Sequence, residues 1–319
     1  MRIVVLDGHT LNPGDNPWDE LARLGTLEVH ARSLREEIVT RACEAEIVLT
    51  NKTRLPADIL ESLPRLRFIA VLATGYDVVD IAAARTRRIP VSNVPEYGTD
   101  SVAQHVFALL LELCHRTGDH DGAVHAGEWT ASPDFSFWRQ SPIELAGLTL
   151  GIVGLGRIGR RVASLAQCFG MKVIRAARTD TAKSDSPIAV VPLAELFATA
   201  DVVTLHCPLV SDNARCVNAG LLQRMKPTAF LINTARGALI EEGDLAAALN
   251  QGLLAGAALD VLSNEPMSKD NPLATARNCI ITPHIAWASL AARRRLMAAT
   301  VQNVRAFIDG RPINVVNGI

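Results

Sequence analysis

The sequence predicts an α/β protein built from two doubly wound parallel-sheet domains. In two stretches, residues 1–98 and 148–282, short β-rich apolar runs alternate with segments of helical periodicity. Such alternation is typical of a parallel sheet covered by helices on both faces. The length of 319 residues exceeds that of most single domains and allows two separate cores.

The order of the elements predicts that the second domain is inserted into the first. A helix from Ser101 to about Arg116 is long enough to cross between domains, and a last helix from Ala288 to Ile308 follows the second series. We expect that last helix to return to the first domain, so that residues 1–100 and 288–319 form one domain and residues 101–287 form the other. The expected strands are Ile3–Leu6, Glu46–Thr50, Arg67–Leu72, Pro90–Ser92, Leu148–Val153, Lys172–Ala176, Val202–His206, Ala229–Asn233, Ala255–Asp260 and Cys279–Thr282.

Composition excludes several classes of function. Apolar residues make up 49% of the chain and its net charge is −1, which gives no electrostatic reason to bind nucleic acid. No apolar run is long enough for a membrane span, and the first apolar run is too short for a signal peptide. The six cysteines are scattered singly and form no zinc-like spacing, so we expect no metal, reduced thiols and a cytoplasmic location.

A glycine-rich loop predicts a dinucleotide site. The pattern G-x-G-x-x-G follows the strand Leu148–Val153 and begins the helix Arg160–Phe169. Glycines at these positions allow a tight turn and a close approach to a pyrophosphate, whose charge is met by N–H groups at the helix start. The residues of this expected contact are Gly154, Leu155, Gly156, Arg157, Ile158 and Gly159.

The end of the next strand favours NADP(H), with NAD(H) still possible. An acidic residue there usually binds the adenosine ribose, but this chain has Ala177, Arg178 and Thr179. An arginine can pair with a 2′-phosphate, which a carboxylate would repel. Two alternatives are that Arg178 is only a solvated charge, and that Asp180 reaches the ribose instead.

Three further strands are each followed by a polar residue suited to redox chemistry on a 2-hydroxy acid. Arg236 follows one strand, Asp260 and Glu265 follow the next, and His284 follows the last. A planar guanidinium binds a carboxylate, an imidazole exchanges the hydroxyl proton, and a carboxylate orients the imidazole. For Asp260 a structural hydrogen bond is the alternative.

These motifs, in this order, resemble the D-2-hydroxyacid dehydrogenase family over essentially the whole chain. The resemblance implies a Rossmann dinucleotide-binding domain inserted into a discontinuous, flavodoxin-like substrate domain. It implies Arg236 as the substrate anchor, Glu265 as the partner of His284, His284 as the acid/base and Asp260 near the nicotinamide carboxamide. It further implies that the backbone of Leu72, Ala73, Thr74 and Gly75 helps to hold the substrate carboxylate. We also expect cofactor contacts from Cys207, Pro208, Thr234, Ala235 and His284.

Several less specific segments are most similar to glycerate dehydrogenases, also called hydroxypyruvate or glyoxylate reductases. They are Val5–Gly8, Asn51–Thr53, Val94–Thr99 and the aromatic loop through Trp129 and Trp138. Trp138 is equally compatible with closing a small substrate pocket and with packing at a subunit contact, and the resemblance implies a homodimer. The alternatives are a 3-phosphoglycerate dehydrogenase and, in a different class, a dinucleotide-sensing corepressor without catalysis.

Overall fold

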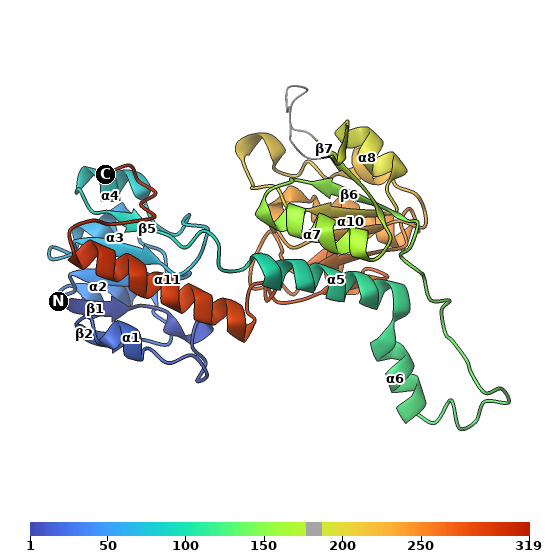
Figure 1. Cartoon of the computed structure of the whole chain (residues 1–319), viewed down its shortest axis with the longest axis horizontal. Helices are drawn as coiled ribbons and strands as arrows, with labels where there is room; N and C mark the ends of the chain where they lie inside the picture. The colour runs from blue at the N-terminus through green and yellow to red at the C-terminus, as the bar shows by residue number, and fades with distance from the viewer. Residues whose placement is uncertain (177–186) are drawn as a thin grey trace. The chain divides into compact units, whose positions relative to one another are not determined.

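The computed structural model describes residues 1–176 and 187–319, and within it the chain divides into two compact units. The first unit contains Met1–Gly98 and Trp287–Ile319, and the second contains Thr99–Ala286. Both units are parallel α/β structures, as predicted (Figure 1). In the described part of the chain, no helix combines the length and the apolar character that crossing a bilayer requires.

The first unit is built on a five-stranded parallel sheet in the order β2-β1-β3-β4-β5. Its central strands are short apolar segments that are buried on both faces, as expected where helices cover both sides of a sheet. The strands are β1 (Arg2–Val5), β2 (Thr26–Val29), β3 (Ile47–Thr50), β4 (Phe68–Val71) and β5 (Val91–Ser92).

Helices from both ends of the chain cover this sheet. On one face, apolar side chains of α1 (Asp19–Ala22) and α11 (Leu290–Ile308) pack against the strands. On the other face lie α2 (Ile38–Ala42), α3 (Ala57–Glu61) and α4 (Ile81–Thr86). The long helix α11, red in Figure 1, therefore returns the chain to the first unit and supplies a large part of its core.

The second unit is built on a seven-stranded parallel sheet in the order β12-β11-β10-β9-β6-β7-β8. After β8 the chain crosses back over the sheet and adds β9 on the other side of β6. The loops that follow β6 and β9 therefore lie at a topological switch point, where such sheets bind ligands. The strands are β6 (Thr149–Val153), β7 (Lys172–Ala176), β8 (Ala189–Val191), β9 (Val202–Leu205), β10 (Phe230–Asn233), β11 (Gly256–Leu259) and β12 (Cys279–Ile281).

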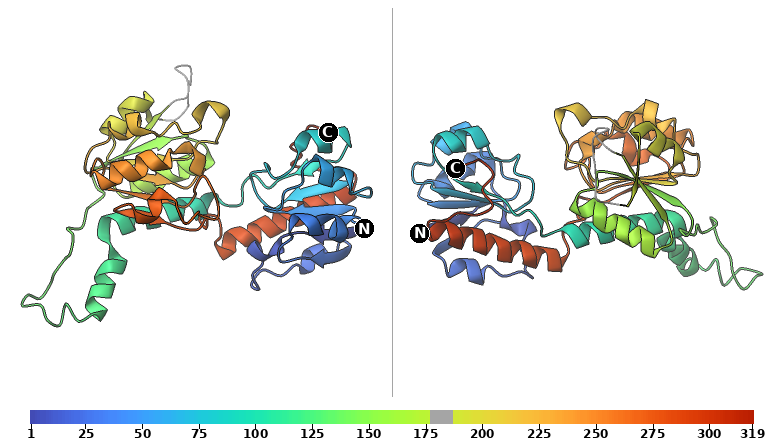
Figure 2. Two further views of the ribbon diagram at one scale, coloured as in Figure 1. Left: turned by 180° about the vertical axis from the view of Figure 1, so that it is seen from behind. Right: turned by 45° about the horizontal axis from the view of Figure 1, so that its top comes forward.

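Two layers of helices enclose this second sheet. The helices α5 (Thr99–His115) and α7 (Arg157–Cys168) pack side by side on one face (Figure 2). The opposite face is covered by α8 (Leu193–Thr199), α9 (Ala219–Leu222) and α10 (Glu242–Asn250).

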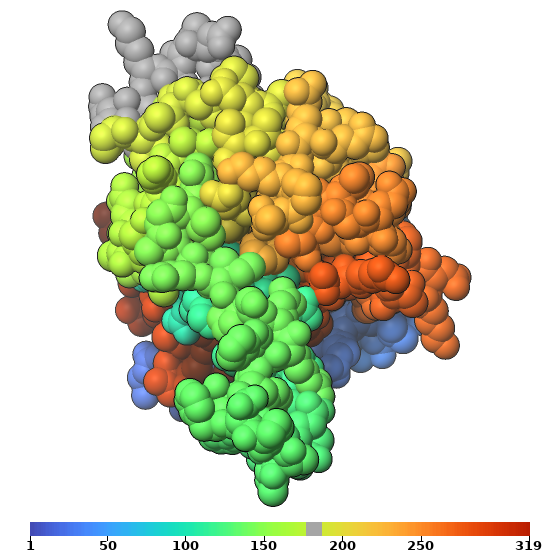
Figure 3. Space-filling model, turned by 90° about the vertical axis from the view of Figure 1, so that its right-hand side faces the viewer, coloured from blue at the N-terminus to red at the C-terminus, as the bar shows by residue number. Residues whose placement is uncertain are grey.

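A short helix and a long loop project from the second unit, and the loop contains the aromatic residues noted in the sequence. The helix is α6 (Thr117–His125), and the loop that follows exposes Trp129, Phe135 and Trp138. Figure 3 shows this green segment on the surface of the second unit. An ion pair between Arg139 and Asp119, 2.7 Å apart, ties the end of the loop back to α6.

The strands β2 and β8 were not expected from the sequence. Each is three or four residues long, lies at the edge of its sheet and is partly exposed. A partly exposed strand at the edge of a sheet needs no continuous apolar run, so its pattern in the sequence is weak.

Candidate active site

The glycine-rich loop joins β6 to α7 and is closely packed on two sides. Gly154 has a φ of 101°, and a Cβ atom there would lie 2.5 Å from the backbone nitrogen of Cys207. A Cβ on Gly159 would lie 2.2 Å from the carbonyl oxygen of Gly154. Both positions therefore require glycine, the first for the left-handed turn and the contact with the end of β9, the second for the packing of α7 on the loop.

The described residues around this loop fit a nicotinamide dinucleotide. A Cβ on Gly156, the residue before α7, would meet nothing within 4 Å, so the space at the start of this helix is open. The first N–H groups of a helix have no partner within the helix and favour a bound anion such as a pyrophosphate. In the described part of the chain, the buried hydroxyl of Thr234 also has no hydrogen-bond partner, so it can form a hydrogen bond with a bound ligand.

The loop after β9 contributes neutral groups to this edge of the sheet. His206 is half-buried, and the loss of solvent around its ring lowers the pKa of the imidazole to about 3, so the ring is neutral and shares a hydrogen bond with Thr204 at 2.9 Å. Burial raises the pKa of the Cys207 thiol. Asn213 donates to the carbonyl of Pro208 at 2.8 Å and fixes the course of the loop.

The predicted ribose contact lies outside the described residues. The strand β7 ends at Ala176, as the sequence predicts, and Ala177, Arg178 and Thr179 follow it. The preference for NADP(H) therefore stays a prediction.

The predicted substrate anchor, Arg236, lies on a loop that Asn233 holds in place. The side chain of Asn233, at the end of β10, donates to the carbonyl of Arg236 at 2.9 Å and accepts from the backbone N–H of Ala235 at 3.0 Å. The Arg236 side chain is exposed, and its Nη1 donates to the Ala235 carbonyl at 2.7 Å. A guanidinium held at its base and exposed at its tip is suited to bind an anionic ligand.

Gly237 brings the Arg236 loop against the loop that carries Glu265. A Cβ on Gly237 would lie 1.8 Å from the carbonyl carbon of Leu262, so only glycine permits this contact between backbones. The backbone N–H of Leu262 in turn donates to Oε1 of Glu265 at 3.0 Å. The arginine and the carboxylate predicted to act together therefore lie on two loops in direct contact.

His284 and Glu265 form the predicted pair. Nδ1 of the imidazole lies 2.6 Å from Oε2 of Glu265, and the two side chains are 27% and 35% exposed. Since a carboxylate only accepts at this contact, Nδ1 carries the hydrogen, and Nε2 is the nitrogen left to exchange a proton with a ligand. The contact with Glu265 fixes the orientation of the imidazole ring, and the acid/base role of His284 stays a prediction.

Asp260 maintains the turn that contains His284. Its carboxylate accepts from the hydroxyl of Thr282 at 2.6 Å and from the backbone N–H groups of Ile285 and Ala286 at 2.8 Å each. His284 has a φ of 55°, a left-handed conformation that is uncommon for residues other than glycine. Asp260 therefore positions the histidine, and its predicted contact with the nicotinamide carboxamide stays a prediction.

The charge of Asp260 is stabilised by these contacts and by His105. Burial raises the pKa of this carboxyl group, but hydrogen bonds from His105, Thr282 and the two backbone N–H groups outweigh burial, and the pKa is lowered. His105 on α5 lies 3.5 Å from Asp260 and 3.1 Å from the Thr282 hydroxyl. We did not predict this part of the network, because a histidine on an apolar helix face gives no sign of its distant partner.

In the first unit, the segment predicted to bind the substrate carboxylate follows β4. The carbonyl of Leu72 accepts from Asn51 Nδ2 at 2.7 Å, and the carbonyl of Thr74 accepts from Asn93 Nδ2 at 2.7 Å. The backbone of Leu72–Gly75 is therefore held by side chains from neighbouring loops, and its role in binding stays a prediction.

Replacing Asp260 by Asn should destabilise the protein in a pH-dependent way. A carboxyl group with a lowered pKa stabilises the folded state above its unfolded pKa of about 3.9, and this stabilisation is lost as the pH falls through the folded pKa. At pH 7 we expect Asp260→Asn to lower the free energy of unfolding by about 1.5–3 kcal/mol, the value of hydrogen bonds to a charged group. Below about pH 4 the difference from the wild type should shrink.

Urea titrations of the full chain between pH 7 and pH 3 measure this effect. Asp270→Asn, an exposed aspartate for which no ion pair is found in the described part of the chain, is the matched control and should unfold like the wild type. An equal urea midpoint for Asp260→Asn and the wild type at pH 7 would show that this carboxylate does not hold the turn.

Comparisons with known proteins agree with this geometry. Residues 107–286 match the family model described as "D-isomer specific 2-hydroxyacid dehydrogenase, NAD binding domain". The chain is 48% identical to a hydroxypyruvate reductase of Blautia hydrogenotrophica, over 99% of this chain and 100% of that protein. It is 42% identical to a glycerate dehydrogenase of Methylorubrum extorquens, over 88% of each.

The fold is shared with solved structures of the same kind. One is an NADPH-dependent glyoxylate/hydroxypyruvate reductase from Sinorhizobium meliloti in complex with NADP and malonate. It superimposes with a TM-score of 0.82 and 27% identity, over 99% of this chain and 96% of that one. The chain therefore belongs to the D-isomer specific 2-hydroxyacid dehydrogenase family and is an oxidoreductase that uses a nicotinamide dinucleotide.

Proposed function

We propose that this enzyme reduces a small 2-oxo acid, with glyoxylate or hydroxypyruvate as the leading substrates and NADPH as the favoured cofactor. The observation that carries the proposal is the contact of 2.6 Å between His284 and Glu265, beside a loop that presents Arg236. Relatives named hydroxypyruvate reductase and glycerate dehydrogenase support the substrate class.

Each of these side chains has one task in the proposed mechanism. Arg236 binds the substrate carboxylate through its planar guanidinium. His284 gives the proton on Nε2 to the oxygen at C2 as that oxygen gains charge, and Glu265 keeps the ring aimed through Nδ1. The reduced nicotinamide supplies the hydride that C2 receives, so the 2-oxo acid and one proton become a 2-hydroxy acid.

A small substrate requires a rigid site. A short 2-oxo acid has few groups to bind, so its orientation depends on how well the protein fixes its own side chains. Asn233 fixes the base of Arg236, Leu262 fixes Glu265, and Asp260 fixes the turn of His284. These contacts support a site that is arranged before the substrate arrives.

One panel of oxidation assays tests the substrate and the cofactor together. NADPH and NADH are each combined with glyoxylate, hydroxypyruvate, phosphohydroxypyruvate and pyruvate, and the absorbance of the reduced nicotinamide is followed. We expect the highest kcat/KM with NADPH and either glyoxylate or hydroxypyruvate. A preference for phosphohydroxypyruvate would instead indicate a 3-phosphoglycerate dehydrogenase, and no oxidation with any acid would indicate a binding protein.

Replacing His284 by Ala should lower kcat by roughly 10²–10⁴, the usual contribution of a positioned acid/base. The matched control is His125→Ala on α6, whose exposed side chain should be dispensable. Steady-state kinetics with the best substrate of the panel provide the measurement. A His284→Ala enzyme with the kcat of the wild type would exclude the proposed proton transfer.

The cofactor preference is tested by the double substitution Ala177→Asp with Arg178→Ala. A carboxylate would repel the 2′-phosphate, and loss of the arginine removes charge-assisted hydrogen bonds of about 1.5–3 kcal/mol. We expect the ratio of kcat/KM for NADPH to that for NADH to fall by roughly tenfold or more. The control is Arg224→Ala, which removes an exposed arginine of the described part of the second unit and should leave the ratio unchanged. An unchanged ratio in the double variant would show that the ribose is bound elsewhere.

A further inference from the structure

The helix α5 contacts the turn that carries His284 at two points. Ser101 and His105 lie four positions apart on this helix, so their side chains project from the same face. The hydroxyl of Ser101 donates to the carbonyl of Ala286 at 2.7 Å. Nε2 of His105 lies 3.1 Å from the hydroxyl oxygen of Thr282. The two contacts therefore bracket His284 in the sequence.

The hydrogen bonds that begin at His105 run in one direction. The Thr282 hydroxyl donates to Oδ1 of Asp260 at 2.6 Å, because an ionised carboxylate can only accept. A hydroxyl has a single hydrogen, so its oxygen must accept from the imidazole, and Nε2 of His105 carries a hydrogen. His105 thus donates to Thr282, and Thr282 donates to Asp260.

Both backbone polar groups of Ala286 are engaged by this arrangement. Its N–H donates to Oδ2 of Asp260 at 2.8 Å, and its carbonyl accepts from Ser101. Ala286 is buried, and in surroundings with little water the loss of one hydrogen-bond partner is costly. The residue two positions after His284 is therefore fixed to α5 directly by Ser101 and indirectly by His105.

The helix α5 is suited to hold this turn in place. It is 17 residues long, packs alongside α7 and buries Val106, Leu110 and Leu113 in the core of the second unit. Residues 282–289 belong to neither a helix nor a strand, so their conformation depends on contacts with the elements around them. A functional group is placed more precisely when a packed helix supports it than when a loop does.

We propose that Ser101 and His105 are positioning residues, through which α5 sets the place of the His284 imidazole. Neither side chain needs to touch the substrate or the cofactor in this role, because each acts on the turn. A displacement of a reacting group by about 1 Å can cost roughly 10²-fold in rate. The expected effect on the rate rests on the proposed function of His284, whereas the expected effect on the turn does not.

Two pairs of variants test the proposal. His105→Phe keeps a ring of similar size but removes the donor, and His105→Gln restores an N–H group near the position of Nε2. Ser101→Ala removes the hydroxyl, and Ser101→Thr restores it. The control is Gln104→Ala, which changes an exposed side chain of the same helix.

Hydrogen exchange of the full chain, followed by mass spectrometry, measures how firmly the turn is held. We expect the segment with Ile285 and Ala286 to exchange roughly tenfold faster in His105→Phe and in Ser101→Ala, with the strand β6 unchanged. His105→Gln, Ser101→Thr and the control should exchange like the wild type. Equal exchange in all variants, or faster exchange over the whole chain, would overturn the proposal.

Steady-state kinetics with the best substrate of the panel measure the consequence for the reaction. In His105→Phe and in Ser101→Ala we expect kcat to fall roughly tenfold, while the KM of the reduced nicotinamide stays within about twofold because the glycine-rich loop is unaltered. The conservative variants should recover most of this loss. Faster exchange of the turn with an unchanged kcat would overturn the positioning role if His284→Ala loses activity. If His284→Ala keeps its activity, the proposed proton transfer fails, and hydrogen exchange alone decides whether α5 holds the turn.

Discussion

The arrangement of the catalytic edge depends on the buried carboxylate of Asp260. Its four donors come from the helix α5 and from residues 282–286, which directly follow β12, so one side chain joins two segments that are far apart in the sequence. The two backbone N–H groups it accepts are those directly after His284, whose φ of 55° needs such a constraint. Without these hydrogen bonds, the backbone of His284 would not be held in the conformation in which its imidazole contacts Glu265.

The two carboxylates near His284 differ because their surroundings differ. Asp260 is 1% exposed and surrounded by donors, so it remains charged and serves as a fixed acceptor. Glu265 is partly exposed, and one of its oxygens is held by a backbone N–H while the other meets the imidazole. Burial with complete hydrogen bonding favours a structural role for Asp260, and partial exposure beside the imidazole of His284 is compatible with the chemical role proposed for Glu265.

The features that could be predicted from the sequence are those whose cause is local. The glycines of the dinucleotide loop, the apolar central strands and the polar residues after them leave a pattern within a few positions of the chain. The network of His105 with Asp260 joins residues that are 155 positions apart, and no local pattern reports such a pair. The positive φ of His284 was not predicted either, since histidine is far less specific for a left-handed turn than glycine. Edge strands such as β2 were not predicted because a partly exposed strand lacks the continuous apolar run that indicates a buried one.

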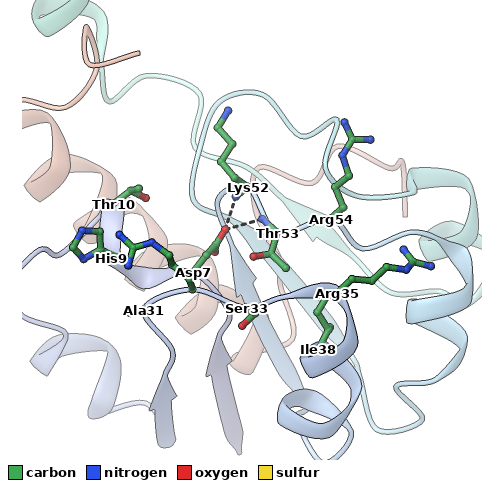
Figure 4. Close-up of a pocket in the computed structure, with 11 residues that line it drawn as sticks. Asp7, His9, Thr10, Ala31, Ser33, Arg35, Ile38, Lys52, Thr53 and Arg54 are labelled. Atoms are coloured by element: carbon green, nitrogen blue, oxygen red, sulfur yellow. Dashed lines mark hydrogen bonds between the residues drawn. The ribbon is translucent and has the colours of Figure 1, made fainter. Parts of the chain in front are cut away.

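The two sheets have different kinds of residue at their topological switch points. In the second unit, the switch point between β6 and β9 uses glycines and helix N–H groups, which demand a close approach and therefore leave a motif. In the first unit, the switch point between β1 and β3 is bordered by long cationic side chains on the loops that follow β2 and β3 (Figure 4). Long side chains reach a ligand without constraining the backbone, so they require no glycine and no fixed spacing. Each of these cations, seen in the sequence alone, is indistinguishable from a solvated surface charge, and only the structure shows that they line one cavity.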